Sequence, residues 1–300
     1  MKELTIFTPV YNRANLIRRL YDSLMRQTNK EFVWQIVDDG STDNIKQVID
    51  AFKSEADFDI RYFYQENAGK HVAHNTGVEL CDTLLFCCVD SDDYLVDNAV
   101  DIIYEVHKKN EQCDYLGYYF RKIDTEGNIS GGDFHLENNA VGLRELYFKY
   151  SFVGELTIVL KTQMIREYEF PVFDNERFVS EKVLYNQLDC IAPMLFIDEP
   201  IYIFEYQQSG YTKNSIRLLS NNPKGGAMGY ISDAAYGKVF IERAKAYSSF
   251  LAMKHIYKLR DKFQIGLKIP LSVKLLGYLF LPHYRKLFRN IKRCYGLEEK

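Results

Sequence analysis

The 300-residue chain lacks the patterns that mark several common protein classes. Its six cysteines form no C-x-x-C pair and no histidines stand at zinc spacing, so there is no zinc-site signature. No G-x-G-x-x-G follows the first expected strand, which argues against a dinucleotide-binding dehydrogenase. No G-x-x-x-x-G-K-[ST] occurs either, which argues against a P-loop NTPase.

A long hydrophobic run is also missing. The longest candidate, Ile265–Pro282, is interrupted by two lysines and a proline. A membrane-spanning helix needs roughly 20 mostly apolar residues, so we expect none here. The chain opens on a strand-like pattern, and we expect no signal peptide. Cys87 and Cys88 lie in an apolar run typical of buried thiols, so we expect a reducing, cytoplasmic compartment.

Charge is unevenly distributed along the chain. Residues 254–293 hold eleven Lys/Arg and one acid, a net charge of +10, whereas the remainder holds 27 basic and 40 acidic residues, a net charge of −13. Leucine, isoleucine and phenylalanine are interleaved with the basic residues, which favours a peripheral contact with an anionic membrane surface. Packing onto the rest of the chain and homodimerisation are the alternatives. We expect no nucleic-acid partner, because no nucleic-acid-binding motif accompanies the charge.

The first 120 residues alternate short apolar runs with stretches of helical periodicity. This alternation predicts an α/β fold with a mainly parallel sheet flanked by helices. The expected strands are Leu4–Thr8, Phe32–Val37, Ile60–Tyr64, Leu84–Val89 and Tyr115–Lys122. The expected helices are Ala14–Arg26, a segment marked by Ile45 to Phe52, Lys70–Leu80 and Asp97–Lys109.

Beyond residue 120 the pattern is less regular. The further expected elements are helices at Val141–Tyr150 and Phe178–Ala192, a strand at Tyr202–Tyr206, and a helical extension from Tyr230 onward. The segment Ser209–Gly229 is rich in Ser, Asn, Gly and Lys, which predicts a mobile lid. The chain therefore divides into residues 1–120, residues 121–229 with the lid, and a basic amphipathic extension over residues 230–300.

Four polar loops follow the first four expected strands. Ligands of such sheets bind beyond the carboxyl ends of the strands. We therefore expect Pro9–Arg13, Asp38–Asp43, Gln65–Lys70 and Asp90–Asp93 to meet on one rim.

The fourth of these loops carries a candidate metal site. Asp90 and Asp92 point the same way in an extended backbone, because side chains alternate. Oxygen ligands of this kind suit Mg²⁺ or Mn²⁺, with phosphate and water completing the coordination. A solvated acidic turn is the alternative. A calcium loop is excluded, because its glycine and glutamate positions hold Leu95 and Asp101.

The first and second loops add weaker signals. After Pro9 and Tyr11 the chain turns into a helix whose N-terminus can face an anion, and Arg13 can pair with a diphosphate. In the second loop Gly40 provides a turn, and Asp39 can accept a hydrogen bond from a nucleotide base. Turn and cap chemistry explains the rest of that loop equally well.

Taken in order, Thr8-Pro9-Val10-Tyr11-Asn12, Val37-Asp38-Asp39-Gly40-Ser41-Thr42-Asp43, Asn67-Ala68-Gly69-Lys70 and Asp90-Ser91-Asp92-Asp93 resemble the signatures of family 2 glycosyltransferases with the GT-A fold. The resemblance spans about residues 3–120 and continues weakly to about 210. It implies inverting transfer of a sugar from a nucleotide-sugar, usually a UDP-sugar, with a divalent metal. The acceptor is then a glycan or a lipid-linked acceptor in cell-surface polysaccharide or glycolipid synthesis.

The resemblance also implies roles for individual residues. Pro9, Tyr11 and Asp39 match positions that hold the base, and residues 1–120 become the nucleotide-sugar-binding half. The D-x-D residues Asp90 and Asp92 match positions that bind ribose and metal. The remaining donor-binding positions are Arg13, Lys70, Asn75 and Ser91. His71 and His74 are expected on the helix surface, without a role.

Inverting transfer needs a general base near the acceptor hydroxyl. The resemblance places it at the start of the helix after Phe178, where Glu181 is the best match. Lys182 stands where a second acid is common in the family, which leaves Glu176, Asp174 and Asp189 as alternatives. A favourable acid in a first helical turn would explain Glu181 without any catalytic role.

Two other functions compete with sugar transfer. A sugar nucleotidyltransferase has a similar fold but carries a Gly-rich loop with Arg or Lys after the first strand, and residues 11–14 lack the glycines. A non-catalytic module that binds glycans or nucleotide-sugars would keep the same donor pocket without activity.

Overall fold

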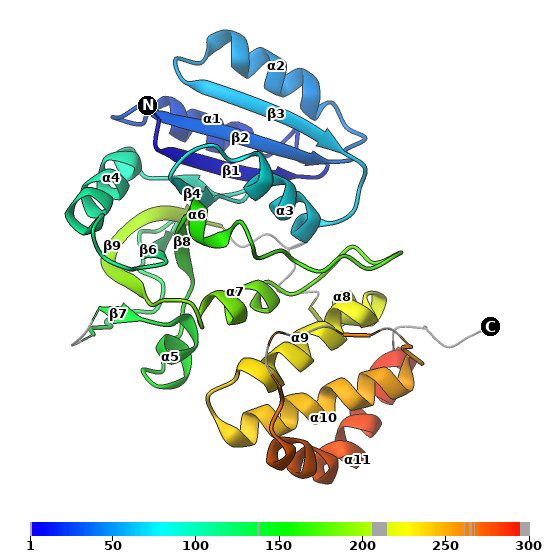
Figure 1. Ribbon diagram of the computed structural model, residues 1–300. Coiled ribbons are helices and arrows are strands. Elements are labelled where there is room, and N and C mark those ends of the chain that lie inside the picture. Colours follow the sequence, from blue (N-terminus) through cyan, green and yellow to red (C-terminus); the bar gives the residue numbers. More distant parts are fainter. Residues whose placement is uncertain are drawn as a thin grey trace. The chain divides into compact units, whose positions relative to one another are not determined.

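The computed structural model describes residues 2–136, 139–205, 215–260, 262, 263, 266 and 268–294 (Figure 1). The chain forms two compact units. The first comprises residues 1–142, 150–169 and 192–207. The second comprises residues 143–149, 170–191 and 208–300. The sheet belongs to the first unit, and the second unit is helical.

Four parallel strands form one half of the sheet. They are β1 (Leu4–Val10), β2 (Phe32–Asp39), β3 (Asp59–Gln65) and β4 (Leu85–Cys88), in the spatial order β3-β2-β1-β4. All eight residues of β2 are buried, as in a strand covered on both faces. The predicted α/β pattern is confirmed here, and the carboxyl ends of these strands lie at one edge of the sheet.

Helices follow these strands close to the predicted positions. They are α1 (Arg18–Met25), α2 (Ile45–Glu55), α3 (Lys70–Leu80) and α4 (Ala99–Asn110). The α-helix α1 starts four residues later than predicted, after a turn in which Arg13 O accepts from the backbone N–H groups of Leu16 and Ile17. The Tyr21 ring of α1 stacks on the Phe52 ring of α2 at 3.9 Å between centroids, so two helices share one apolar core with the sheet.

The other half of the sheet is mixed. It contains β5 (Tyr94–Leu95), β6 (Gly117–Asp124), β7 (Ala140–Val141), β8 (Leu156–Lys161) and β9 (Met194–Phe204). Strand β8 was not predicted; it lies antiparallel between β4 and β6 and continues into the short helix α6 (Thr162–Ile165). Strand β9 starts eight residues before the predicted strand. The prediction missed this first part because exposed Asp198 and Glu199 interrupt the apolar pattern, next to a register shift opposite Arg121.

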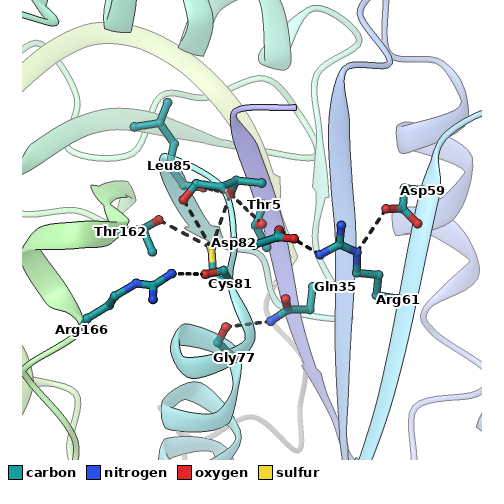
Figure 2. A network of polar contacts seen from close by, with 11 residues as sticks. Thr5, Gln35, Asp59, Arg61, Gly77, Cys81, Asp82, Leu85, Thr162 and Arg166 are labelled. Atoms are coloured by element: carbon teal, nitrogen blue, oxygen red, sulfur yellow. Dashed lines mark hydrogen bonds and ion pairs between the residues drawn. The ribbon is translucent and has the colours of Figure 1, made fainter. Parts of the chain in front are cut away.

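A buried polar network ties the entry of β4 to its neighbours (Figure 2). The Thr83 hydroxyl lies 2.8 Å from the Thr5 hydroxyl and donates to Leu85 O at 2.9 Å. The Cys81 sulfur lies 3.5 Å from the Thr162 hydroxyl. Cys81 is therefore a structural thiol. Of the pair predicted to be buried, Cys87 is fully buried and Cys88 only half-buried, at the end of its strand.

The described helices of the second unit are α5 (Leu143–Phe148), α7 (Lys182–Leu188), α8 (Ser215–Asn221), α9 (Pro223–Tyr236), α10 (Phe240–Ile256) and α11 (Leu271–Cys294). Both α5 and α7 are shorter than predicted. No helix among the described residues is long and apolar enough to cross a membrane.

The irregular loop expected over Ser209–Gly229 is helical in its second half, and its role as a lid stays a prediction. Residues 206–214 lie outside the described residues, but the rest of the segment forms α8 and the start of α9. Pro223 occupies the first turn of α9, where proline fits well. A Cβ on Gly225 would lie 2.0 Å from Phe178 O, so this glycine serves close packing rather than flexibility.

Candidate active site

The first two loops of the predicted rim are joined by hydrogen bonds. Asn12 adopts a positive φ of 54°, and its side-chain Oδ1 accepts from Thr42 N at 2.8 Å. Asn12 N donates to Ser41 Oγ at 2.9 Å, and Ala14 N donates to Asp43 Oδ2 at 2.9 Å. The residues that sequence reasoning treated as turn formers therefore hold the Pro9–Arg13 loop against the loop after β2.

Asp39 joins the second loop to the third. Its carboxylate accepts from Ala68 N, Gly69 N and Gln65 Nε2, each at 2.8 Å, and the residue is buried. A carboxylate offers about four lone-pair sites, and three are used here. Contact with a base through the fourth stays a prediction.

Gly40 makes the approach of these two loops possible. Its φ is +78°, and a Cβ there would lie 2.6 Å from Asn67 N. No L side chain fits such a position without strain. The glycine chosen from the sequence as a turn former therefore also permits the contact with the third loop.

The fourth loop places Asp90 beside Lys70. Lys70 Nζ lies 2.8 Å from Asp90 Oδ1, and about a third of each side chain is exposed. Burial acts to raise the pKa of Asp90, but Lys70, Lys122 and Arg13 together outweigh it and lower the pKa. Asp90 is therefore ionised, and basic groups of the first and third loops act on its carboxylate.

Residues 91 and 92 form a turn in which Asp93 N donates to Asp90 O at 3.2 Å, so the extended backbone predicted to align Asp90 and Asp92 is not present. Asp92 is half-buried, and Ser91 between them is buried. The described residues contain no group of three or more His, Cys, Asp or Glu side chains that could hold a metal ion. A site made by Asp90 and Asp92 fits Mg²⁺ or Mn²⁺ only if phosphate and water supply the remaining ligands.

Two residues that contact this loop or its supporting tyrosine, Tyr202 and Lys122, were missed by sequence reasoning. Tyr202 OH donates to Asp93 Oδ2 at 2.8 Å and accepts from Asp90 N at 3.1 Å, and Lys122 Nζ lies 4.0 Å from the centre of the Tyr202 ring. Burial, with the charge of Asp90, raises the pKa of Asp93 to about 6. Asp93, the third aspartate of the motif, was the available signal.

The other predicted donor residues lie on the same loops. Pro9, within β1, and Arg13, in the loop after it, are half-buried, whereas Tyr11 of the same loop is exposed. Lys70 is the first residue of α3, and Asn75 is half-buried further along that helix. Their roles toward a donor stay predictions.

The expectation that His71 and His74 lie on the helix surface is wrong. Both are buried, because α3 packs against the sheet. The His74 ring meets the edges of the Phe7 and Phe86 rings, with centroids 5.9 and 5.4 Å away. Burial lowers the pKa of His71 to about 4.

The candidates for the base lie in the second unit. Glu181 is exposed at the N-terminus of α7, and Asp174 is exposed in the loop before it. Glu176 instead accepts from Lys224 N and Gly225 N, both at 2.8 Å, and so caps α9. Asp189 accepts from Leu143 N at 2.5 Å at the start of α5. Two of the alternatives therefore have structural roles, and Glu181 stays the predicted base.

The chain is similar in sequence to a known protein family and to named glycosyltransferases. The profile of glycosyl transferase family 2 matches residues 5–168. Glycosyltransferase GlyG of Streptococcus pneumoniae is 24% identical over 73% of this chain and 76% of its own length. Chondroitin synthase of Escherichia coli is 32% identical, but the match covers 42% of this chain and only 18% of that protein.

Solved structures share the fold. S. aureus TarS 1-349 in complex with UDP-GlcNAc has a TM-score of 0.65 at 14% identity, covering 98% of this chain and 92% of that one. Mannosyltransferase PcManGT of Pyrobaculum calidifontis, in complex with GDP-Man and Mn²⁺, has a TM-score of 0.52 at 15% identity, covering 99% of this chain and 76% of that one. These likenesses support the GT-A type of α/β fold.

The family match begins in β1 and includes all four loops of the rim, together with the β8 strand that sequence reasoning missed. It covers more than half of the chain. The chain therefore belongs to glycosyl transferase family 2 and is a glycosyltransferase.

Proposed function

We propose that this glycosyltransferase moves a sugar from a UDP-sugar to an acceptor hydroxyl with inversion, using Mn²⁺ or Mg²⁺ held by Asp90 and Asp92. The observation that carries the proposal is the ionised Asp90 paired with Lys70 on a rim where four strand-end loops meet. Carboxylates and a lysine within one small site suit a nucleoside diphosphate with its cation. The UDP-GlcNAc complex of TarS supports a uridine donor.

The donor would lie along the rim. In this proposal Pro9, Tyr11 and the free lone pair of Asp39 contact the base, and Asp90 with Ser91 contacts the ribose. Lys70 and Arg13 are the cations that face the diphosphate, with Asn75 beside it. The metal, when bound by Asp90 and Asp92, would neutralise charge on the leaving diphosphate.

Glu181 would take the proton of the acceptor hydroxyl. The residue is exposed at the start of α7. As the hydroxyl oxygen bonds to the anomeric carbon, the bond from that carbon to the diphosphate oxygen breaks on the opposite face. One displacement of this kind inverts the anomeric configuration.

The acceptor would be a glycan or lipid-linked acceptor of cell-surface polysaccharide or glycolipid synthesis, a context supported by chondroitin synthase among the relatives. In this division residues 1–120 bind the donor, residues 121–229 bind the acceptor, and residues 230–300 form the basic extension. We place the enzyme at the inner face of the cell membrane.

Helix α11 supports that placement. Its buried residues include Val273, Gly277 and Leu281. Leu271, Leu275 and Leu279 form a second, exposed stripe, exposed by 70%, 60% and 75%. An exposed apolar stripe on a basic helix is suited to an anionic membrane surface. Co-sedimentation with anionic but not neutral vesicles tests this, and equal binding to both would count against it.

Donor hydrolysis and transfer test the catalytic proposal. We expect Asp92→Asn to lower the Mn²⁺-dependent rate with UDP-GlcNAc by about 10³-fold, since one preorganised electrostatic contact is worth about that much. Mn²⁺ binding followed by electron paramagnetic resonance should weaken in parallel. Asp50→Asn, at an exposed carboxylate of α2, is the matched control. A wild-type rate for Asp92→Asn in EDTA would overturn the metal site.

The same assay separates the alternatives. Release of pyrophosphate from UTP and a sugar phosphate would indicate a nucleotidyltransferase. Retained UDP binding without transfer or hydrolysis across donors and acceptors would indicate a binding module.

A further inference from the structure

The second unit contains a cavity of about 730 Å³ that has no part in the proposed transfer reaction. This volume lies within the range of small-molecule sites. Helices α5, α7, α8, α9, α10 and α11 all contribute to its lining. Most of the wall is apolar, with Leu219, Met253 and Phe288 among the lining side chains. An apolar cavity of this size favours a hydrocarbon ligand.

The rim of the cavity is apolar as well. Tyr147 and Phe148 of α5 and Leu287 of α11 all line it and are exposed by 37%, 52% and 41%. Large apolar side chains that are exposed together mark a surface that contacts another apolar body. The exposed stripe of Leu271, Leu275 and Leu279 lies on the same helix as Leu287.

A charged cluster forms part of the wall. Arg144 Nη1 lies 3.1 Å from Asp233 Oδ1, and Lys182 Nζ lies 2.5 Å from Asp233 Oδ2. Asn186 completes the cluster, accepting from Arg144 Nη1 at 2.6 Å and donating to Asp233 Oδ1 at 3.0 Å. Two cations share one carboxylate, so the cluster carries one positive charge in excess.

The rest of the lining leaves this excess in place. Lys245 is paired with Glu242 at 2.8 Å, which is neutral as a pair. Ser220 and Tyr257 add hydroxyl groups, and burial raises the pKa of Tyr257, which keeps it neutral. The lining therefore combines apolar walls with three basic and two acidic side chains, a net charge of +1, while Asp189 outside the lining also acts on Arg144. Lys182 supplies part of that charge at the position where family resemblance led us to expect an acid.

We propose that the cavity lined by α5, α7, α8, α9, α10 and α11 binds one hydrocarbon chain of an amphiphile with an anionic head. The hydrocarbon chain occupies the space between the apolar side chains of α10 and α11, and the anionic head lies against Arg144 and Lys182. Two kinds of molecule share this chemistry, an acyl phospholipid and an isoprenyl phosphate. The proposal goes beyond the transfer reaction and does not rest on it.

Binding of cis-parinaric acid, a fluorescent fatty acid, measures the site in the full-length protein. We expect saturable binding that Ala246→Trp weakens at least 10-fold, because the indole ring would fill the cavity from α10. Ile241→Trp is the matched control, since it adds the same ring at an exposed position of α10 outside the lining. Equal binding by wild type and Ala246→Trp, or no binding by the wild type, would overturn the proposal.

A second variant guards against misfolding of the first. Leu287→Glu places a negative charge at the exposed rim, and we expect it to weaken the binding of the fatty acid at least 5-fold with an unchanged thermal midpoint. Competition by lysophosphatidylglycerol or by farnesyl phosphate then shows whether the site prefers an acyl phospholipid or an isoprenyl phosphate. Displacement by neutral dodecyl maltoside as effective as by either anion would refute the role of Arg144 and Lys182.

Donor hydrolysis keeps this test separate from the proposed function. We expect Ala246→Trp to hydrolyse UDP-GlcNAc at the wild-type rate, because its substitution lies in the second unit and touches no donor residue. Lost lipid binding with retained hydrolysis supports the cavity proposal alone. Retained lipid binding in an inactive wild type would refute the transfer reaction and leave the cavity standing.

Discussion

The carboxylates of the two units differ in what brings them next to their partners. In the first unit Asp39 ends β2, and Asp90 and Asp92 follow β4, so these three residues lie at the same edge of the sheet. In the second unit Glu176, in the loop before α7, and Asp233 of α9 bind partners on helices that lie 48 and 89 positions away in the chain. In a parallel sheet, the residues at the carboxyl ends of successive strands lie close together whatever their side chains are. Between packed helices, contacts depend on which side chains fit against one another.

The strongest test of this difference uses two glutamates of the same unit, Glu181 and Glu176. We expect Glu181→Gln to lower kcat by about 10²–10⁴-fold, the usual contribution of a positioned base. Its free energy of unfolding should stay near the wild-type value, because the side chain is exposed. Steady-state kinetics and urea unfolding measure the two effects. If kcat is unchanged, Asp174 becomes the candidate base.

Gly40 tests whether the rim depends on the approach of two loops. We expect Gly40→Ala to cost about 2–4 kcal/mol of unfolding free energy, since the left-handed backbone and the contact with Asn67 N both oppose a Cβ. Affinity for UDP should fall as well. Gly127→Ala is the control, because Gly127 also has a positive φ but has open space around it. Equal losses in the two variants would mean that backbone strain alone matters.

The burial of His71 on α3 should make the free energy of unfolding depend on pH. Its pKa of about 4 in the folded state lies below the unfolded value of 6.5, so the folded state favours the neutral ring. The resulting stability is present above pH 6.5 and is lost as pH falls through 4, by up to about 3 kcal/mol. Urea unfolding of wild type and His71→Phe at pH 7 and pH 4.5 measures it. A pH dependence of the same slope in His71→Phe would contradict the assignment.

The smallest expected effect is on the stability of the Glu176 variant. We expect lower stability with an unchanged rate, the opposite of the Glu181→Gln result. We expect Glu176→Gln to cost about 1 kcal/mol of unfolding free energy, because a neutral amide caps α9 less well than a carboxylate. The rate per folded molecule should not change. A large fall in kcat with unchanged stability would instead make Glu176 the base and overturn its capping role.

The candidate site was predictable where local pattern and topology agree. The bounds of α3 and the four rim loops follow from apolar periodicity and from loops at strand ends. The supporting contacts of Tyr202 and Lys122 did not follow, because they come from strands β9 and β6, whose pairing no local pattern encodes. The helix in the second half of the predicted lid did not follow from the sequence, because the close packing of Gly225 depends on Phe178, which lies far away in sequence.

The sequence by itself determined the α/β order of the first unit, the polar loops after β1, β2, β3 and β4, and the aspartate pair that follows β4. Periodicity and turn chemistry act over a few residues, so they can be read without knowing the partner. Tertiary structure alone decided the mixed half of the sheet, the burial of His71 and His74, and the capping roles of Glu176 and Asp189. It also decided the cavity of the second unit, because each of these depends on which side chains from distant segments fill the same space.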